Sequence, residues 1–253
     1  MVGNLITQSF WDCVIKFYKR KEALFVGKIK MNKVSKDYKT NSQLVRALNR
    51  VTLEIKVGTS VAIRGKSGSG KSTVLNILAG IIEPTEGDVW YGETNICRLS
   101  EKARCDFRTQ NIGIVFQSFQ LLEELTVYEN ICFPIYLQNK NIDEKKIKTL
   151  IEIVGLEHKT DVYPNQLSGG EQQRVAIARA FASNPKIVLA DEPTGNLDEA
   201  TSSQIIDLFL KCKEIYEQTL IVVTHDDDVA KKMNRIITLR DGTIIHDTEG
   251  TYE

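Results

Sequence analysis

The sequence predicts an α/β protein with a mostly parallel sheet, an antiparallel β-flank and an inserted helical segment. Two wholly apolar runs, 187–190 and 220–223, are typical of strands buried on both faces of a parallel sheet, and a helical pattern separates them. Residues 51–55 alternate apolar and polar side chains, which indicates a half-exposed antiparallel strand. Helix-start signals concentrate in residues 118–182, so we expect the helical subdomain there.

Composition limits the classes of function. The 253 residues are 42% hydrophobic, which is enough to fill a core. Lys plus Arg and Asp plus Glu both number 33, so no net field favours a nucleic-acid partner. The five cysteines show no metal-binding spacing, which fits a reducing cytosol. No apolar run has the length of about 18 residues that a membrane span needs, so we expect any membrane role to come through a partner.

The chain divides into an N-terminal extension, residues 1–27, and one domain, residues 28–253. Aromatic and apolar residues in the extension recur at helical spacing among basic residues, which indicates a short amphipathic helix. One interpretation is an anchor on a membrane surface or partner. The alternatives are a helix folded onto the domain, or an extension from an upstream start codon.

The helices of the inserted segment have recognisable starts. Thr126 and Glu129 have the spacing of a capping box. Asp143 is placed to cap a second helix that ends at Gly155. These signals predict two helices before residue 160.

A glycine-rich stretch lies between the predicted strand 60–64 and a helix that starts at residue 71. It matches G-x-x-x-x-G-K-[ST] and reads Gly65-Lys66-Ser67-Gly68-Ser69-Gly70-Lys71-Ser72, with Thr73 next. Glycines let successive backbone N–H groups surround an anion, and the helix N-terminus adds unpaired donors. We therefore predict that residues 65–73 bind a nucleotide's phosphates. A flexible Ser/Gly linker is the alternative, and the flanking strand and helix disfavour it.

Four side chains in and near this loop have the chemistry for phosphate hydrolysis. Lys71 is expected to bridge the β- and γ-phosphates, and the Ser72 hydroxyl to ligate Mg²⁺. Asp191 follows the apolar run 187–190, at the carboxyl end where ligands bind, and is expected to be a second metal ligand. The adjacent Glu192 is the candidate general base. Taken alone, an Asp-Glu pair after a strand is commonly just a turn.

A second helix start has exposed backbone. Ser168 and Glu171 form another capping-box pattern, and Gly169 and Gly170 lie between them. This helix end is also suited to phosphate. From the cap alone, an ordinary capped helix is the simpler interpretation.

These motifs resemble those of the ABC ATPases. Leu167–Glu171 matches that family's signature motif, and residues 195–198 resemble its D-loop. Gln117 resembles the glutamine that senses Mg²⁺ and couples to the membrane partner, and His225 resembles the switch histidine that contacts the γ-phosphate. Tyr38 resembles the aromatic residue that stacks on adenine. Each residue alone has an ordinary structural explanation, but six motifs occur in the family's order across residues 38–226.

The resemblance implies a P-loop NTPase fold with a RecA-like core, and the use of ATP and Mg²⁺. It also implies a homodimer in which Lys71 of one copy and Ser168, Gly169 and Gly170 of the other enclose each ATP. The membrane partner would be a permease subunit, which places the chain in the cytoplasm, peripheral on the inner face of the membrane. The sequence of residues 191–198 resembles that found in the branch of the family that serves lipoprotein release, macrolide export and antimicrobial-peptide export.

Two questions about partners stay open at this stage. We expect the permease to dock near Gln117, where some of five apolar residues form a groove unless all fill the subdomain core: Phe119, Leu121, Leu122, Ile131 and Phe133. The alternative function is a nucleotide-gated switch that regulates an envelope protein without transport. A soluble DNA-repair or translation protein of the same family fits less well, because only one P-loop is present and the segment between Gln117 and Ser168 is short.

Overall fold

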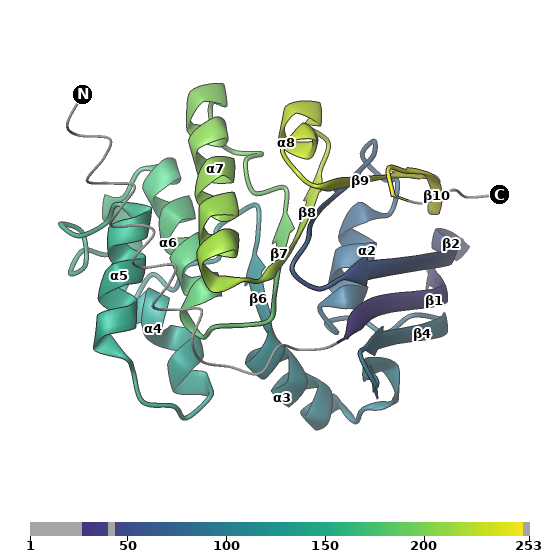
Figure 1. The fold of residues 1–253 in the computed structure, drawn as a ribbon, viewed down its shortest axis with the longest axis horizontal. Coiled ribbons are helices and arrows are strands. Elements are labelled where there is room, and N and C mark those ends of the chain that lie inside the picture. Colours follow the sequence, from purple (N-terminus) through teal and green to yellow (C-terminus); the bar gives the residue numbers. More distant parts are fainter. Residues whose placement is uncertain (1–26, 40–43, 250–253) are drawn as a thin grey trace.

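The computed structural model describes residues 27–39 and 44–249. The predicted amphipathic helix of the N-terminal extension lies outside the described residues. Within them the chain is α/β, as the apolar runs predict (Figure 1). None of the helices in the described ranges combines the length and the apolar composition that a bilayer span needs.

The described residues form a six-stranded sheet in the order β10-β9-β3-β8-β7-β6. Strands β9, β3, β8, β7 and β6 pair in parallel, and β10 adds antiparallel at the edge. The apolar runs form β7 and β8, whose side chains are buried nearly throughout because helices cover both faces of the sheet. The strands are β3 Ser60–Arg64, β6 Ile112–Val115, β7 Ile187–Asp191, β8 Thr219–Thr224, β9 Arg235–Arg240 and β10 Thr243–Asp247.

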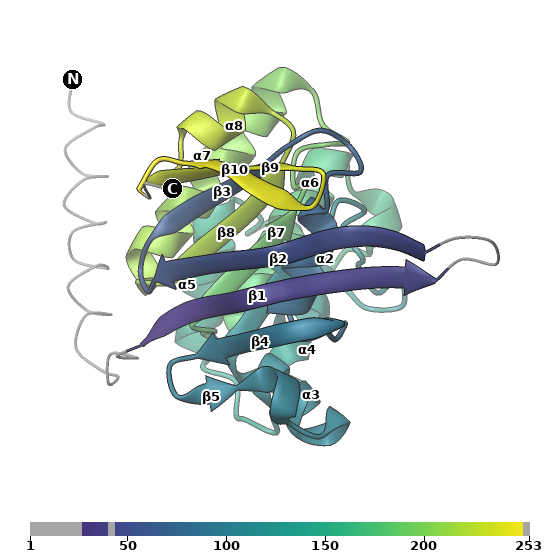
Figure 2. The same ribbon diagram turned by 90° about the vertical axis from the view of Figure 1, so that its right-hand side faces the viewer.

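A second, antiparallel sheet in the described part has the order β2-β1-β4-β5 (Figure 2). The alternation in residues 51–55 has its expected cause: Val51, Leu53 and Ile55 face the core while the residues between them are exposed. Helix α2, Lys71–Leu78, packs between the two sheets and shares their hydrophobic core. The strands are β1 Lys28–Lys39, β2 Leu44–Lys56, β4 Glu86–Tyr91 and β5 Thr94–Asn95.

The helical segment contains α4 Val127–Leu137, α5 Glu144–Val154 and α6 Gly169–Ala182, with a 3₁₀ turn at Pro164–Gln166. Both predicted caps are present. Thr126 and Glu129 form a complete capping box, and the Asp143 side chain accepts from Lys146 N. Helix α5 ends at Gly155 with a φ of 70°. The 3₁₀ turn Ile96–Arg98 and helix α3, Glu101–Asn111, precede this segment and lead into β6.

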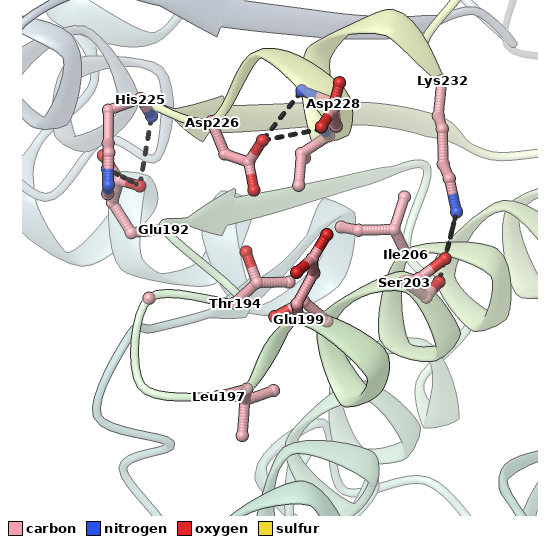
Figure 3. A pocket seen from close by; sticks show the side chains of 13 residues that line it. Glu192, Thr194, Leu197, Glu199, Ser203, Ile206, His225, Asp226, Asp228 and Lys232 are labelled. Atoms are coloured by element: carbon pink, nitrogen blue, oxygen red, sulfur yellow. Dashed lines mark hydrogen bonds and ion pairs between the residues drawn. The ribbon is translucent and has the colours of Figure 1, made fainter.

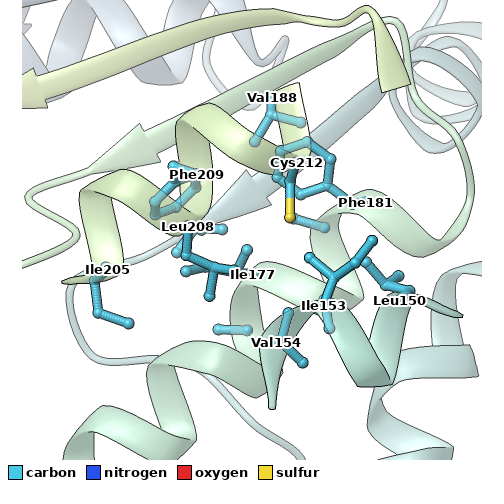
Figure 4. Close-up of a cluster of buried hydrophobic side chains, with 14 of the residues drawn as sticks. Leu150, Ile153, Val154, Ile177, Phe181, Val188, Ile205, Leu208, Phe209 and Cys212 are labelled. Atoms are coloured by element: carbon cyan, nitrogen blue, oxygen red, sulfur yellow. The ribbon is translucent and has the colours of Figure 1, made fainter. Parts of the chain in front are cut away.

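Helix α7, Glu199–Tyr216, packs together with α5 and α6 on one face of the parallel sheet. Figure 4 shows side chains from α5, α6, β7 and α7 meeting in this core. Phe181 is fully buried in this core, with its ring centroid 6.4 Å from that of Phe209 and 6.1 Å from that of Tyr216. The helical segment therefore shares a continuous core with the sheet. The short helix α8, Asp227–Lys231, follows β8.

Candidate active site

The predicted catalytic residues gather at one edge of the parallel sheet. The glycine-rich loop follows β3, Asp191 is the last residue of β7, and His225 follows β8. Because β3, β8 and β7 are parallel neighbours, their carboxyl ends meet at this edge. The parallel sheet thus brings these three segments, which are far apart in the sequence, into one site.

Glycines shape the phosphate loop at two points of close approach. A Cβ on Gly65 would clash with the carbonyl oxygen of Leu239 on β9. Gly70 has a φ of 100°, and a Cβ there would lie 2.5 Å from the carbonyl oxygen of Ala47 on β2. The turn after β9 also contacts the loop, since Gly242 N donates to Ser69 O at 3.1 Å. Strands from both ends of the chain therefore hold the loop in shape.

The start of α2 is open to an anion. Its N-cap residue is Gly70, so no side chain caps the first N–H groups of the helix. The buried Lys71 side chain turns back into the loop, and its Nζ donates to the carbonyl oxygens of Gly65 at 2.9 Å and Lys66 at 3.1 Å. The same nitrogen lies 3.8 Å from Glu192 Oε1. The loop thus contains backbone donors and a positive charge, as phosphate binding requires.

Ser72 and Asp191 form the expected oxygen pair. Ser72 Oγ donates to Asp191 Oδ1 at 3.1 Å, which joins the start of α2 to the end of β7. Burial raises the pKa of the Asp191 carboxyl, the Ser72 hydrogen bond opposes this rise, and the neighbouring Glu192 charge adds to it. A hydroxyl and a carboxylate are hard oxygen donors, which fit a Mg²⁺ ion that also binds substrate phosphates.

Glu192 and His225 are in direct contact (Figure 3). His225 Nδ1 lies 2.8 Å from Glu192 Oε2, and the backbone N–H of His225 donates to the same oxygen at 3.3 Å. An ionised carboxylate only accepts hydrogen bonds, so the imidazole Nδ1–H is the donor to it. Glu192 adopts a φ of 46°, and its N–H is held by Val223 O at 2.9 Å. Such a left-handed backbone in a non-glycine residue is common at functional sites.

A pocket of about 500 Å³ opens beside this pair. It runs between the start of α7 and α8, and its lining includes four acidic side chains, those of Glu192, Glu199, Asp226 and Asp228 (Figure 3). Lys232 closes its far side by donating to Asp207 at 2.6 Å and to Ser203 Oγ at 2.9 Å. The pocket is lined by Glu192, Thr194, Gly195, Leu197, Glu199, Ser202, Ser203, Ile206, His225, Asp226, Asp228, Val229 and Lys232.

Gln117 lies two residues beyond the end of β6, the strand next to β7. It is exposed, and its backbone oxygen accepts from Asn196 Nδ2 at 2.9 Å. The structure therefore brings Gln117 next to residues 195–198, which follow Glu192. It is the point where the sheet leads into the helical segment.

Arg179 and Gln173 were not among the residues expected from the sequence, although both contact these loops. Arg179 on α6 donates to the carbonyl oxygens of Phe119 at 2.8 Å and Gln120 at 2.6 Å. Both acceptor residues have left-handed backbone, with φ of 59° and 52°. Burial lowers the pKa of Arg179 to about 10. Gln173, fully buried, donates to Pro193 O at 2.5 Å. The sequence does contain a signal for both residues: Gln173 and Arg179 are long polar side chains on a helix whose buried residues are otherwise apolar.

The second predicted phosphate-binding end is the start of α6. Ser168 Oγ accepts from Glu171 N at 3.3 Å, and Glu171 Oε2 accepts from Ser168 N at 2.9 Å, which completes the predicted capping box. The hydrogen bonds from Ser168 hold the pKa of Glu171 below its usual value. Within the described residues, no hydrogen bond or ion pair joins Ser168, Gly169 or Gly170 to the loop 65–73. One chain does not bring the two phosphate-binding ends together.

Tyr38 lies near the end of β1, with 40% of its surface exposed. It is paired with Val45 on β2, two residues from the Ala47 carbonyl that touches Gly70. Lys36 Nζ lies 5.3 Å from the centroid of its ring. The ring is therefore exposed on the hairpin that borders the phosphate loop, and its contact with adenine stays a prediction.

Comparison with known proteins identifies the family. Residues 48–195 match the family model "ABC transporter". The lipoprotein-releasing system ATP-binding protein LolD of Legionella pneumophila is 44% identical over 214 residues, which cover 84% of this chain and 94% of that protein. The macrolide export ATP-binding/permease protein MacB of Rhodopirellula baltica is 41% identical, over 87% of this chain and 33% of that protein.

Solved structures agree with this match. The ATP-binding cassette MJ0796, in a dimeric post-hydrolysis state bound to ADP and Pi, superimposes with a TM-score of 0.80 at 41% identity and covers 87% of this chain and 97% of that one. The chain therefore belongs to the ABC transporter family, and its fold is that of an ABC ATPase cassette. It is an ATP-binding subunit that hydrolyses ATP to drive a transporter. None of these relatives favours the regulatory switch that transports nothing.

Proposed function

We propose that the chain hydrolyses MgATP with Glu192 as general base, within a homodimer that encloses ATP at its interface. The contact that carries this assignment is His225 Nδ1 to Glu192 Oε2 at 2.8 Å, with Lys71 Nζ 3.8 Å from the same carboxylate. A carboxylate, an imidazole and a lysine side chain thus lie together at one sheet edge, which supports the assignment. The Glu192 carboxylate would accept the proton of the attacking water, and His225, held by Glu192, would contact the γ-phosphate.

The phosphates would be held by the chain's own donors. Residues 65–73 would supply backbone N–H groups, and Lys71 would exchange its two carbonyl acceptors for the β- and γ-phosphate oxygens. Ser72 and Asp191, joined by a 3.1 Å hydrogen bond, would be protein ligands of Mg²⁺, and the side chain of Gln117 would be a third. The bound ion would neutralise the charge that develops on the phosphates.

The homodimer would complete each site from two copies. Within one chain, Ser168, Gly169 and Gly170 are separated from the loop 65–73. In a dimer with a twofold axis, these residues of each copy would face the loop of the other copy, which gives two equivalent sites. The dimeric structure of MJ0796, with 42% identity and a TM-score of 0.80, supports this arrangement. Under the same proposal, residues 28–253 form the ATPase domain, with residues 118–182 as its helical subdomain.

We further propose that the ATPase works with a separate permease at the inner face of the membrane, in export or extraction. The match spans 94% of LolD, named for lipoprotein release, and 33% of MacB, which is named a macrolide export ATP-binding/permease protein. Tyr38 would stack on the adenine of the bound ATP.

The permease would dock on the helical segment. We expected only some of the five apolar residues to form a groove, and Ile131 is one that fills the core, because α4 turns it inward. Phe119 and Leu121 are partly buried against that core, and Leu122 and Phe133 are also partly exposed. Tyr136 and Leu137, exposed by 50% and 58%, extend this apolar surface to the end of α4.

The test of the catalytic assignment is Glu192→Gln. This change keeps the shape of the side chain but removes the base, so ATP turnover should fall by about 10²- to 10⁴-fold while ATP-dependent dimers accumulate in size-exclusion chromatography. Glu199→Gln is the matched control, because Glu199 is an exposed carboxylate that lines the same pocket. Equal turnover by wild type and Glu192→Gln would overturn the general-base assignment.

A further inference from the structure

Gln117 rests on a two-residue seat formed by Gly195 and Asn196. Asn196 Nδ2 donates to the Gln117 backbone oxygen at 2.9 Å. The side-chain amide of Gln117 lies over Gly195, where an added Cβ would be 2.8 Å from Nε2 and 3.3 Å from Cδ. Asn196 therefore holds the backbone of Gln117, and the missing side chain of Gly195 makes room for its amide.

The seat belongs to the same short turn as Glu192. Gly195 N donates to Glu192 O at 3.0 Å, and Leu197 N donates to Thr194 O at 3.1 Å, so residues 192–197 form a hydrogen-bonded unit. The buried Gln173 on α6 fixes this unit from below through Pro193 O. A displacement of the turn would thus move the seat and the carboxylate together.

Both seat residues are exposed, and neither contributes to a hydrophobic core. In the described part of the chain, the Asn196 side chain donates one hydrogen bond, to the Gln117 carbonyl, and it is exposed, so we expect its removal to affect stability little. The contacts of Gly195 and Asn196 with Gln117 are therefore more readily explained by a role at the active site than by a role in folding.

We propose that Gly195 and Asn196 are positioning residues that set the location of the Gln117 amide relative to Glu192. The inference rests on the proposed role of Gln117 at the Mg²⁺ site, and it adds residues that this role needs. Because the seat and Glu192 share one turn, the amide reaches its working position only when the turn that carries the general base is in place. A displacement of reacting groups by about 1 Å can lower the reaction rate by about 10²-fold. The position of the Gln117 amide relative to Glu192 should therefore affect kcat.

The two seat residues can be perturbed in different ways. Gly195→Ala places a methyl group against the Gln117 amide and displaces it, whereas Asn196→Ala releases the Gln117 carbonyl without steric conflict. Each variant is made alone and combined with Gln117→Ala. The measurements are kcat and the Mg²⁺ concentration for half-maximal hydrolysis at saturating ATP, together with thermal unfolding.

We expect each seat variant to lower kcat by about 10-fold or more and to raise the Mg²⁺ requirement, with an unchanged unfolding temperature. Combined with Gln117→Ala, neither change should lower kcat further, because there is no longer an amide to position. Asn141→Ala is the matched control, since Asn141 is an exposed loop asparagine between α4 and α5.

The outcomes separate the two levels of the proposal. If Gln117→Ala lowers kcat but the seat variants turn over like wild type, the seat is refuted and the role of Gln117 stands. If the losses from the seat variants add in full to that of Gln117→Ala, the seat acts by another route and the inference is equally refuted. If Gln117→Ala itself hydrolyses MgATP normally, the proposed role of Gln117 falls and the seat falls with it.

Discussion

The ion pair between Arg235 on β9 and Asp247 on β10 gives a quantitative test of how the fold holds its C-terminal hairpin. Asp247 has 0% and Arg235 8% of its side chain exposed. The guanidinium donates to both carboxylate oxygens, with Nε to Oδ1 at 2.7 Å, and its Nη1 donates to Glu54 O on β2 at 2.7 Å. The pair therefore joins the hairpin to the antiparallel sheet.

Asp247→Asn keeps the packing but leaves the buried guanidinium without its nearest negative charge. Breaking a buried pair in this way costs about 3–5 kcal/mol of unfolding free energy. For a chain of this length, about 2–4 °C of melting temperature are lost per kcal/mol, so we expect a fall of about 6–20 °C. Replacing both partners by apolar residues of similar volume should recover most of this loss, because no uncompensated charge is then buried.

Denaturant unfolding without nucleotide, followed by circular dichroism, measures this cost. Glu249→Gln is the matched control: Glu249 lies 3.6 Å from the same arginine, but its side chain is 39% exposed. An exposed ion pair contributes about 0–1 kcal/mol, so the control should unfold nearly like wild type. If Asp247→Asn costs no more than Glu249→Gln, burial does not govern the strength of this pair and the reasoning fails.

Two further predictions concern the helical segment. Leu137→Arg should reduce the amount of protein retained on membranes that contain the permease by about 10-fold or more, with an unchanged melting temperature, because Leu137 is 58% exposed on the proposed docking surface; equal retention would place the docking surface elsewhere. For Glu171, whose pKa is lowered by Ser168, the stabilisation is fully present above the ordinary value of 4.5 and is lost as the pH falls through the lower folded-state pKa. The difference in unfolding free energy between wild type and Glu171→Gln should therefore shrink below pH 4.5, and a pH-independent difference would contradict this origin.

The parts of the fold that were predictable from sequence are those with a local physical signal. The apolar runs of β7 and β8 lie between covering layers, and the caps at Thr126, Asp143 and Ser168 are governed by residues three positions apart. The phosphate loop was predictable because its glycines, lysine and flanking elements occur within one short stretch.

Contacts between distant segments had no such signal. Arg179 contacts carbonyl groups about 60 residues earlier in the chain, and Asn196 contacts one 79 residues earlier. The exposure of apolar residues in the helical segment also depends on tertiary packing: Ile131 and Phe133 are two positions apart, and only the first is fully buried. Periodicity predicts that a helix has an apolar face, but the neighbouring elements determine how wide that face is.

The contacts that enclose the phosphate loop also have a consequence for the folding of the chain during its synthesis. Leu239 and Gly242, which press on Gly65 and hold Ser69, are translated more than 160 residues after the loop itself. A nascent chain with residues 65–73 outside the ribosome still lacks one side of that enclosure. Until β9 and the turn after it emerge, the loop lacks its contacts with Leu239 and Gly242, so we expect a nascent chain to bind nucleotide more weakly than the full chain.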